Sequence, residues 1–444
     1  MSQTLVDSYL ESLLNGQSSL PSSPRGWLDA LRADALERAN ALSLPTTRDE
    51  EWRYTDLSPL YQKSFHRASA AETPPERALD AHTLPEPGCR LVFVDGHYVA
   101  GLSSVCDDAA LTVRAFTQAL ADQDPALQAH LARHVPVGDD PFVAVNTAWL
   151  QDGVLVHARA GTAAQAPVHV LCVSTQAGSA GYPRLLVVAE ANSECTVVED
   201  FVTLHEGEYL TNAVTEIALE EGARVRHARV QREGGAAFHI GTCGVRIGRG
   251  AHYLNSAVAL GGRISRFNLN IVQAGEGAES TLDGLTLISG KQLADTHSLL
   301  DHRHPHGRSR QLFKSIVDES AHAVFNGKIF VHQGAQRTDS SQQSRSLLLS
   351  PRARVDTKPQ LEIFADDVKC AHGAAVGQLE AEQVFYLKSR GLDEASARNL
   401  LTFAFAAEIV RRIPLPSLAA QLERIVLQQT QKQTQQQTSN RNRT

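Results

Sequence analysis

The chain has 444 residues, of which 42% are hydrophobic and 20% charged, and its formal net charge is −7. This length allows a large buried core in about three structural units, and the acidic balance argues against a nucleic-acid binder, which needs basic residues to neutralise phosphates. No apolar run approaches the roughly 18 residues that span a bilayer, and the N-terminus lacks the basic start and apolar stretch of a secretory signal. We therefore expect a soluble, cytoplasmic protein that binds neither nucleic acid nor membrane.

Residues 1–135 are predicted to form an N-terminal helical region that also contains a β-hairpin. Apolar residues at helical spacing predict a helix that begins at Trp27 and ends before Pro45. Further along, two β-rich runs flank Asp95 and Gly96, a pair typical of a tight hairpin turn.

Residues 136–380 are predicted to be mainly β, because short runs of Val, Leu and Ile alternate with Gly-containing or acidic turns. A Gly-Ala or Ser-Ala motif recurs at 221–225, 249–253, 276–280 and 319–323. A period of about 30 residues indicates stacked coils, and we interpret the one step of 43 residues as an insertion of a His-rich segment. The predicted fold is a right-handed parallel β-helix core flanked by N-terminal and C-terminal helical regions, with a large β-sandwich as the alternative.

Residues 381–427 are predicted to form a C-terminal helical domain. Asp393 is a candidate N-cap, and a second helix is expected to begin with Ser417 as its cap. Residues 428–444 are rich in Gln and contain no apolar residue, so we expect a disordered tail. In the first helix, apolar residues spaced four apart fall on one face: Leu401, Phe405, Ile409 and Ile413.

Four histidines within ten residues form the first candidate metal site. They are His297, His302, His304 and His306, with Asp295 or Asp301 as an accompanying carboxylate. Several imidazoles that titrate near pH ~6.5 favour transient binding of iron or another divalent ion. The alternative is a polar, solvated loop. None of the six cysteines forms a CxxC pair, so we expect reduced thiols and no self-contained cysteine metal site.

Cys370 and His372 form the second candidate. If residues 368–372 form a strand, these two side chains point to the same face, because side chains alternate along a strand. A thiol beside an imidazole is half of a metal site, whereas the alternative is a buried thiol next to a hydrogen-bonded histidine. The sequence has no GxSxG, P-loop or dinucleotide-binding motif, so nothing in it establishes an enzyme.

Several motifs together resemble the SufB/SufD family of iron–sulfur cluster assembly scaffolds. The resemblance extends over most of the chain, and within the family it is to the SufD type. SufB-type chains carry a cysteine where this chain has Ala353, and an acid follows their histidine where this chain has Gly373. The motifs that carry the resemblance are EEWRYTDL at 50–57, FNGKI at 325–329, AQRTD at 335–339, TKPQLEI at 357–363, KCAHGAAVGQL at 369–379 and FYLKSRG at 385–391.

The resemblance implies a non-catalytic scaffold subunit of a SufB–SufC–SufD complex that assembles clusters and transfers them to acceptor proteins. It implies a heterodimer with a SufB-like paralogue and a transient iron–sulfur cluster at that interface, with His372 as a ligand and Cys370 in support. It also implies that a SufC-like ABC ATPase, which hydrolyses ATP, docks on the C-terminal helices through the apolar face of Leu401, Phe405, Ile409 and Ile413. Reduced flavin is associated with such complexes, although we find no flavin motif. A secreted-type β-helix enzyme acting on polysaccharides, a His-loop metal hydrolase, and a homodimer of the isolated chain are the alternatives that the sequence leaves open.

Overall fold

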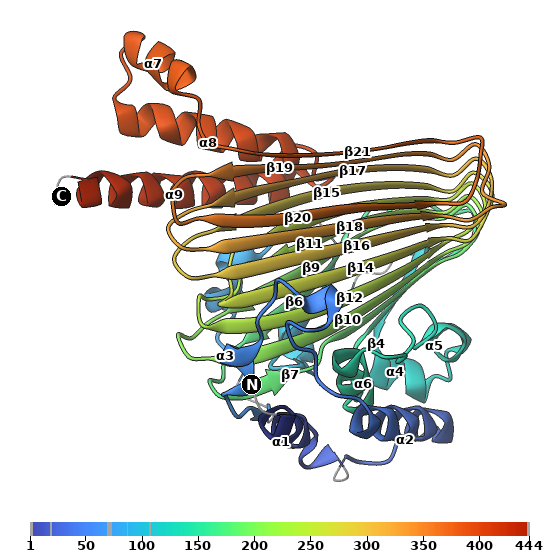
Figure 1. The fold of residues 1–444 in the computed structure, drawn as a ribbon. Helices are drawn as coiled ribbons and strands as arrows, with labels where there is room; N and C mark the ends of the chain where they lie inside the picture. The colour runs from blue at the N-terminus through green and yellow to red at the C-terminus, as the bar shows by residue number, and fades with distance from the viewer. Residues whose placement is uncertain (1–2, 18–19, 69–72, 87, 106–107, 442–444) are drawn as a thin grey trace.

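The computed structural model of the chain describes residues 3–17, 20–68, 73–86, 88–105 and 108–441. Two long sheets face each other in a β-solenoid of about eight turns, with helices at its N-terminal and C-terminal ends (Figure 1). This confirms the predicted β-helix core flanked by helical regions. Among the described residues, no helix has the length and hydropathy needed to cross a membrane.

Successive strands of the solenoid alternate between two sheets, and each strand pairs in parallel with the strand two positions later in the chain. Ile264 pairs with Leu293 and Leu293 with His322, so one turn takes 29 residues here. The first sheet contains β8 (Arg184–Ala189), β10 (Tyr209–Leu219), β12 (Ala237–Ile247), β14 (Ile264–Gln273), β16 (Leu293–His302), β18 (His322–Val331) and β20 (Arg354–Ile363). The second sheet contains β9 (Glu194–Thr203), β11 (Arg224–Gln231), β13 (His252–Ala259), β15 (Glu279–Ile288), β17 (Arg308–Val317), β19 (Asp339–Leu348) and β21 (Lys369–Gly377).

The strand register places similar residues in columns inside the solenoid. Val245, Ile271, Leu300 and Ile329 stand in one column across four neighbouring strands, and all four are buried. No single turn could bury such a face by itself, so each turn depends on its neighbours for a core.

Both sheets begin in the region that we assigned to the N-terminal domain. β2 and β3 form the hairpin predicted at Asp95, and β2 also pairs in parallel with β6, while β4 pairs with β5. The boundary expected at residue 135 therefore falls within continuous sheets. These early strands are β1 (His66–Arg67), β2 (Cys89–Val94), β3 (His97–Tyr98), β4 (Leu111–Ala115), β5 (Val154–Ala158), β6 (Val168–Ser174) and β7 (Ser179–Gly181).

Helices cover the first turns. The helix predicted from Trp27 is α2 (Gly26–Ala41), whose Leu28, Ala35 and Ala39 are buried. The other N-terminal helices are α1 (Gln3–Leu14), η2 (Glu50–Trp52), α3 (Ser58–Tyr61), η3 (Glu76–His82), η4 (Ala100–Leu102), α4 (Phe116–Ala121), α5 (Pro125–His130) and α6 (Pro141–Ala148).

The His-rich segment is a regular turn, which corrects the predicted insertion. β16 ends at His302 and β17 begins at Arg308. Three of the Gly-Ala motifs precede strands of the second sheet, whereas the motif at 319–323 precedes β18 in the first sheet, and this change of sheet explains the step of 43 residues. His306 has a φ of 61°, two residues before β17, where Gly277 takes the same left-handed conformation before β15.

Three helices follow the solenoid: α7 (Ala381–Ser389), α8 (Glu394–Val410) and α9 (Pro416–Arg441). Asp393 caps α8 as predicted, because its carboxylate accepts a hydrogen bond of 2.8 Å from the backbone N–H of Ser396. The structure continues α9 to Arg441, where we expected disorder from residue 428. Residues 442–444 of that expected tail lie outside the described residues.

Candidate functional site

The solenoid is open at its C-terminal end. β20 and β21 are the last strands of their sheets, and within the described chain each pairs on one side only, with β18 and β19 respectively. Large apolar side chains at this end are exposed, including Phe364 at 59% and Val376 at 48%. Long unpaired strand edges are a template for pairing with another chain, and soluble proteins ordinarily protect them.

Cys370 and His372 lie on β21 at this open end. They stand in register with the buried Ser340 and Gln342 of β19, so both side chains belong to the inner face of the second sheet. Cys370 is half-buried and packs against the interior core, whereas His372 is exposed. Burial raises the pKa of the Cys370 thiol, which keeps it protonated at neutral pH.

The backbone of β21 has N–H groups that point to the unpaired edge of the sheet. Lys369 donates its N–H to the carbonyl of Thr338 at 2.8 Å, on the side of β19. Because peptide groups alternate along a strand, the N–H groups of Cys370, His372 and Ala374 point to the open edge. A chain that pairs with this edge would therefore lie directly beside the thiol and the imidazole.

Cys370 and His372 supply one thiol and one imidazole, which is fewer than the four ligands of a complete iron–sulfur site. Ala353 is buried in the turn before β20, and Gly373 follows His372 without a side chain. A cluster held here would need ligands from a second molecule.

The four histidines of the first candidate site do not converge. His302 is buried inside the solenoid, where its Nε2 lies 3.1 Å from the Ser309 hydroxyl and burial lowers its pKa to about 4. His297 lies on the outer face of β16, His304 is exposed in the turn, and His306 holds the left-handed turn position. In the described part of the chain, no group of three or more His, Cys, Asp or Glu side chains is placed to hold a metal ion. Alternation along β16 puts His297 and His302 on opposite faces of the strand, so the structure does not bring these two imidazoles together.

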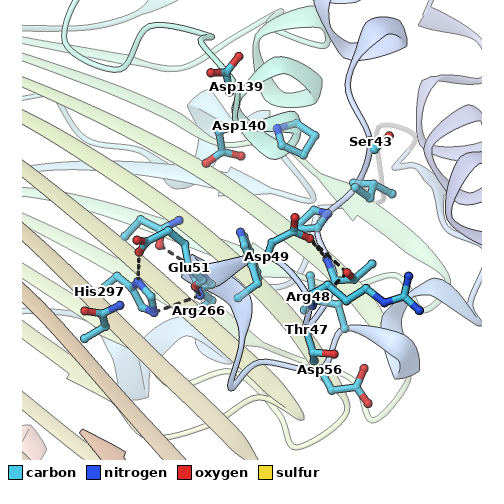
Figure 2. A pocket seen from close by; sticks show the side chains of 18 of the residues that line it. Ser43, Thr47, Arg48, Asp49, Glu51, Asp56, Asp139, Asp140, Arg266 and His297 are labelled. Atoms are coloured by element: carbon cyan, nitrogen blue, oxygen red, sulfur yellow. Dashed lines mark hydrogen bonds and ion pairs between the residues drawn. The ribbon is translucent and has the colours of Figure 1, made fainter. Parts of the chain in front are cut away.

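His297 instead lines a pocket of about 820 Å³ (Figure 2). The pocket lies between residues 43–58, residues 139–141 and the outer face of β14, β16 and β18. His297 Nδ1 is 3.3 Å from a Glu51 oxygen and its Nε2 is 3.1 Å from Asp295. Arg266 donates to the other oxygen of Asp295 at 2.5 Å.

These charges fix the N-terminal segment to the solenoid. Arg266 lies 3.7 Å from the ring centroid of Trp52, and Thr55 donates to Asp295. Burial alone would lower the pKa of His297, but the charge of Asp295 and hydrogen bonds to Asp295 and Glu51 raise it. The motif at 50–57 is therefore a structural clamp on β14 and β16. Sequence reasoning identified that motif and His297 separately, but no local signal indicated that they meet.

The apolar face predicted on α8 is largely internal. Ile409 and Ile413 are buried against the outer face of the second sheet, and Phe405 packs beside them. Lys314 of β17 donates to the Phe405 carbonyl at 2.9 Å and pairs with Glu408, which anchors the helix. Leu401 is half-buried.

A different apolar surface is exposed on the C-terminal helices. α7 stands clear of the sheets (Figure 1) and buries none of its residues. Phe385 is 73% exposed, Tyr386 is 56% exposed and Leu400 on α8 is 45% exposed. We call these three residues the α7–α8 patch.

The cysteines differ in part from the expectation of reduced thiols. Cys89 is disulfide-bonded, which is a correction, because pairing depends on contacts that spacing alone does not reveal. The free cysteines of the described chain are Cys172, Cys195, Cys243 and Cys370.

The fold and the site together define a class of protein: a β-solenoid whose open end bears a thiol and an imidazole. Residues 172–405 match the SUF system FeS cluster assembly SufBD core domain, and residues 4–170 match the SufBD protein N-terminal region. The chain belongs to the SufBD family of iron–sulfur cluster assembly proteins.

Its relatives include an iron–sulfur cluster assembly SufBD family protein of Synechocystis, 39% identical over 96% of both chains. The iron–sulfur cluster assembly protein SufD of Escherichia coli is 33% identical over 85% of this chain and 87% of the relative. A chloroplastic protein of Arabidopsis thaliana, ABCI7, is 32% identical over 93% of this chain and 88% of the relative.

Proposed function

We propose that this chain is a non-catalytic scaffold subunit of a SufB–SufC–SufD assembly, which builds iron–sulfur clusters and transfers them to acceptor proteins. The observation that carries the proposal is the open end of the solenoid, where two unpaired edges lie beside Cys370 and His372. Membership of the SufBD family supplies the chemistry of the cargo.

The partner at the open end is a SufB-like paralogue. β20 and β21 offer edges of 10 and 9 residues, which suit a second parallel solenoid that continues the same two sheets. The exposed Ile363, Phe364 and Val376 would become buried in this junction.

The nascent cluster is the cargo of this junction. His372 supplies an imidazole ligand, Cys370 supports it, and the paralogue supplies the remaining ligands. Incomplete ligation by each subunit suits a cluster that must be released to an acceptor. The association with reduced flavin stays a prediction.

The C-terminal helices dock the SufC-like ATPase. We place the contact on the α7–α8 patch, because Ile409 and Ile413 are already buried against the solenoid. ATP hydrolysis belongs to that partner, in agreement with the lack of a P-loop in this sequence.

Native mass spectrometry of the tagged chain, purified anaerobically from cells that co-express both partners, tests the proposal. We expect one assembly that contains this chain, a SufB-like paralogue and a SufC-like ATPase. A homodimer or monomer that excludes both co-expressed partners would contradict it.

A further inference from the structure

Three polar side chains occupy one column on the inner face of the second sheet at the open end. Gln311 on β17, Gln342 on β19 and His372 on β21 stand in register on three successive turns. Beside them run Ser309, Ser340 and Cys370. In the same column, earlier turns place Val197, His227, Asn255 and Leu282, so the column already contains buried polar residues before its last three positions.

Gln342 has unmet hydrogen-bonding capacity. It is only 1% exposed, yet neither its Nε2 nor its Oε1 has a hydrogen-bond partner in the described structure. Buried amides are ordinarily hydrogen-bonded. One turn earlier, Gln311 uses its Oε1 to accept a hydrogen bond of 2.9 Å from Ser298.

A glycine gives Gln342 the room that it occupies. Gly327 on the opposite sheet stands in register with Ser298, so the position that provides a partner for Gln311 provides none for Gln342. A Cβ at Gly327 would lie 2.2 Å from Nε2 of Gln342. The amide thus reaches across the interior towards Gly327, from the strand that pairs directly with the strand carrying His372.

We propose that Gln342 is a positioning residue for His372. Neutral imidazole has one N–H and one free nitrogen, and a histidine that binds a metal donates its other N–H to an acceptor. Gln342 Oε1 accepts that N–H when the ring turns towards the interior, and so holds the remaining nitrogen towards the iron of the cluster. This inference rests on the proposed role of His372.

The test compares substitutions of two glutamines in the same column. Gln342→Leu removes the acceptor behind His372, and Gln311→Leu removes a buried amide that does not neighbour His372. In the anaerobically purified complex, we measure the rate at which an iron chelator removes the cluster. We expect about 10-fold faster loss for Gln342→Leu, as for other changes to groups that orient a metal ligand, and a wild-type rate for Gln311→Leu.

A third variant separates positioning from packing. Gln342→Glu keeps an acceptor oxygen but places a carboxyl group in the interior. If the role of Gln342 is purely structural, cluster loss should therefore be faster in Gln342→Glu than in Gln342→Leu. Positioning predicts cluster loss slower than in Gln342→Leu. Pulsed EPR of the reduced cluster in protein with ¹⁵N-labelled histidine provides a second readout, because the nitrogen coupling that is missing in His372→Ala should change in Gln342→Leu.

Equal rates for Gln342→Leu and Gln311→Leu would overturn the inference while His372 keeps its role. A cluster that is unaffected by His372→Ala would overturn the proposed function instead, and the role of Gln342 with it.

Discussion

At the scale of single residues, His297 is a pH-dependent link between residues 50–57 and the solenoid. Its pKa in the folded chain is raised by Asp295 and Glu51, above the value near ~6.5 expected in the unfolded chain. The stabilisation is therefore complete below pH ~6.5 and is lost as pH rises through the folded pKa. Asp295 does not limit the acidic side, because Arg266 and His297 outweigh its burial and lower its pKa to about 2.

We predict that His297→Gln lowers the free energy of unfolding by about 1–3 kcal/mol at pH 6, the range for hydrogen bonds to charged groups, and by less at pH 9. Urea unfolding at the two pH values measures the difference. His304→Gln, in an exposed turn, is the control and should change neither value. An effect of His297→Gln that is the same at both pH values would contradict the role of its charge.

Single residues also show what the sequence alone can and cannot predict. Alternation correctly placed Cys370 and His372 on one face of a strand. The same alternation separates His297 from His302, whose odd spacing puts one outside the solenoid and one inside. The contact of His297 with Glu51 joins segments that are distant in sequence, and no periodicity reports such a contact.

At the scale of elements, α7 buries none of its residues, so its side chains can be tested for a role in binding rather than in the core. We predict that replacing Phe385 and Tyr386 together with alanine weakens binding of the SufC-like ATPase at least 10-fold, because both side chains are exposed and aromatic anchors carry much of the energy of an interface. Isothermal titration calorimetry of the purified proteins measures the affinity.

Leu427→Ala is the matched control, since Leu427 is another exposed apolar residue on the C-terminal helices. It should leave both the affinity and the thermal stability close to wild type. Wild-type affinity in the Phe385/Tyr386 variant would place the docking surface elsewhere.

The edge of β21 gives a second prediction at this scale. Ala374→Pro removes an N–H that points away from β19, so it should spare the fold but weaken pairing with the SufB-like paralogue. Co-purification from cells that express both chains measures the pairing, and circular dichroism checks the fold. Ala374→Ser keeps the N–H and should pair normally; equal recovery of the two variants would show that β21 does not form the junction.

Helix periodicity had a similar limit. The pattern predicted the position and N-cap of α8, and both are present. It could not assign the apolar face to a partner, since burial against the solenoid and burial against another protein require the same residues. Ile409 and Ile413 face β-strands of their own chain.

At the scale of the whole molecule, the solenoid was predictable because its turns repeat. Short strands at a period of about 30 residues and left-handed turn positions such as Gly222, Gly250 and Gly277 are local signals. The register that pairs Gln342 with His372 depends on the lengths of all the preceding turns, so it is seen only in the complete structure.

The central claim is that the open end of this chain shares a nascent cluster with a paralogue through His372. The measurement that tests it most directly is the iron and acid-labile sulfide content of the anaerobically purified complex with His372→Ala, compared with wild type and with His304→Ala. We predict that His372→Ala lowers the cluster content several-fold while the subunit composition is unchanged, and that His304→Ala matches wild type. A full cluster content in an intact His372→Ala complex would contradict the account.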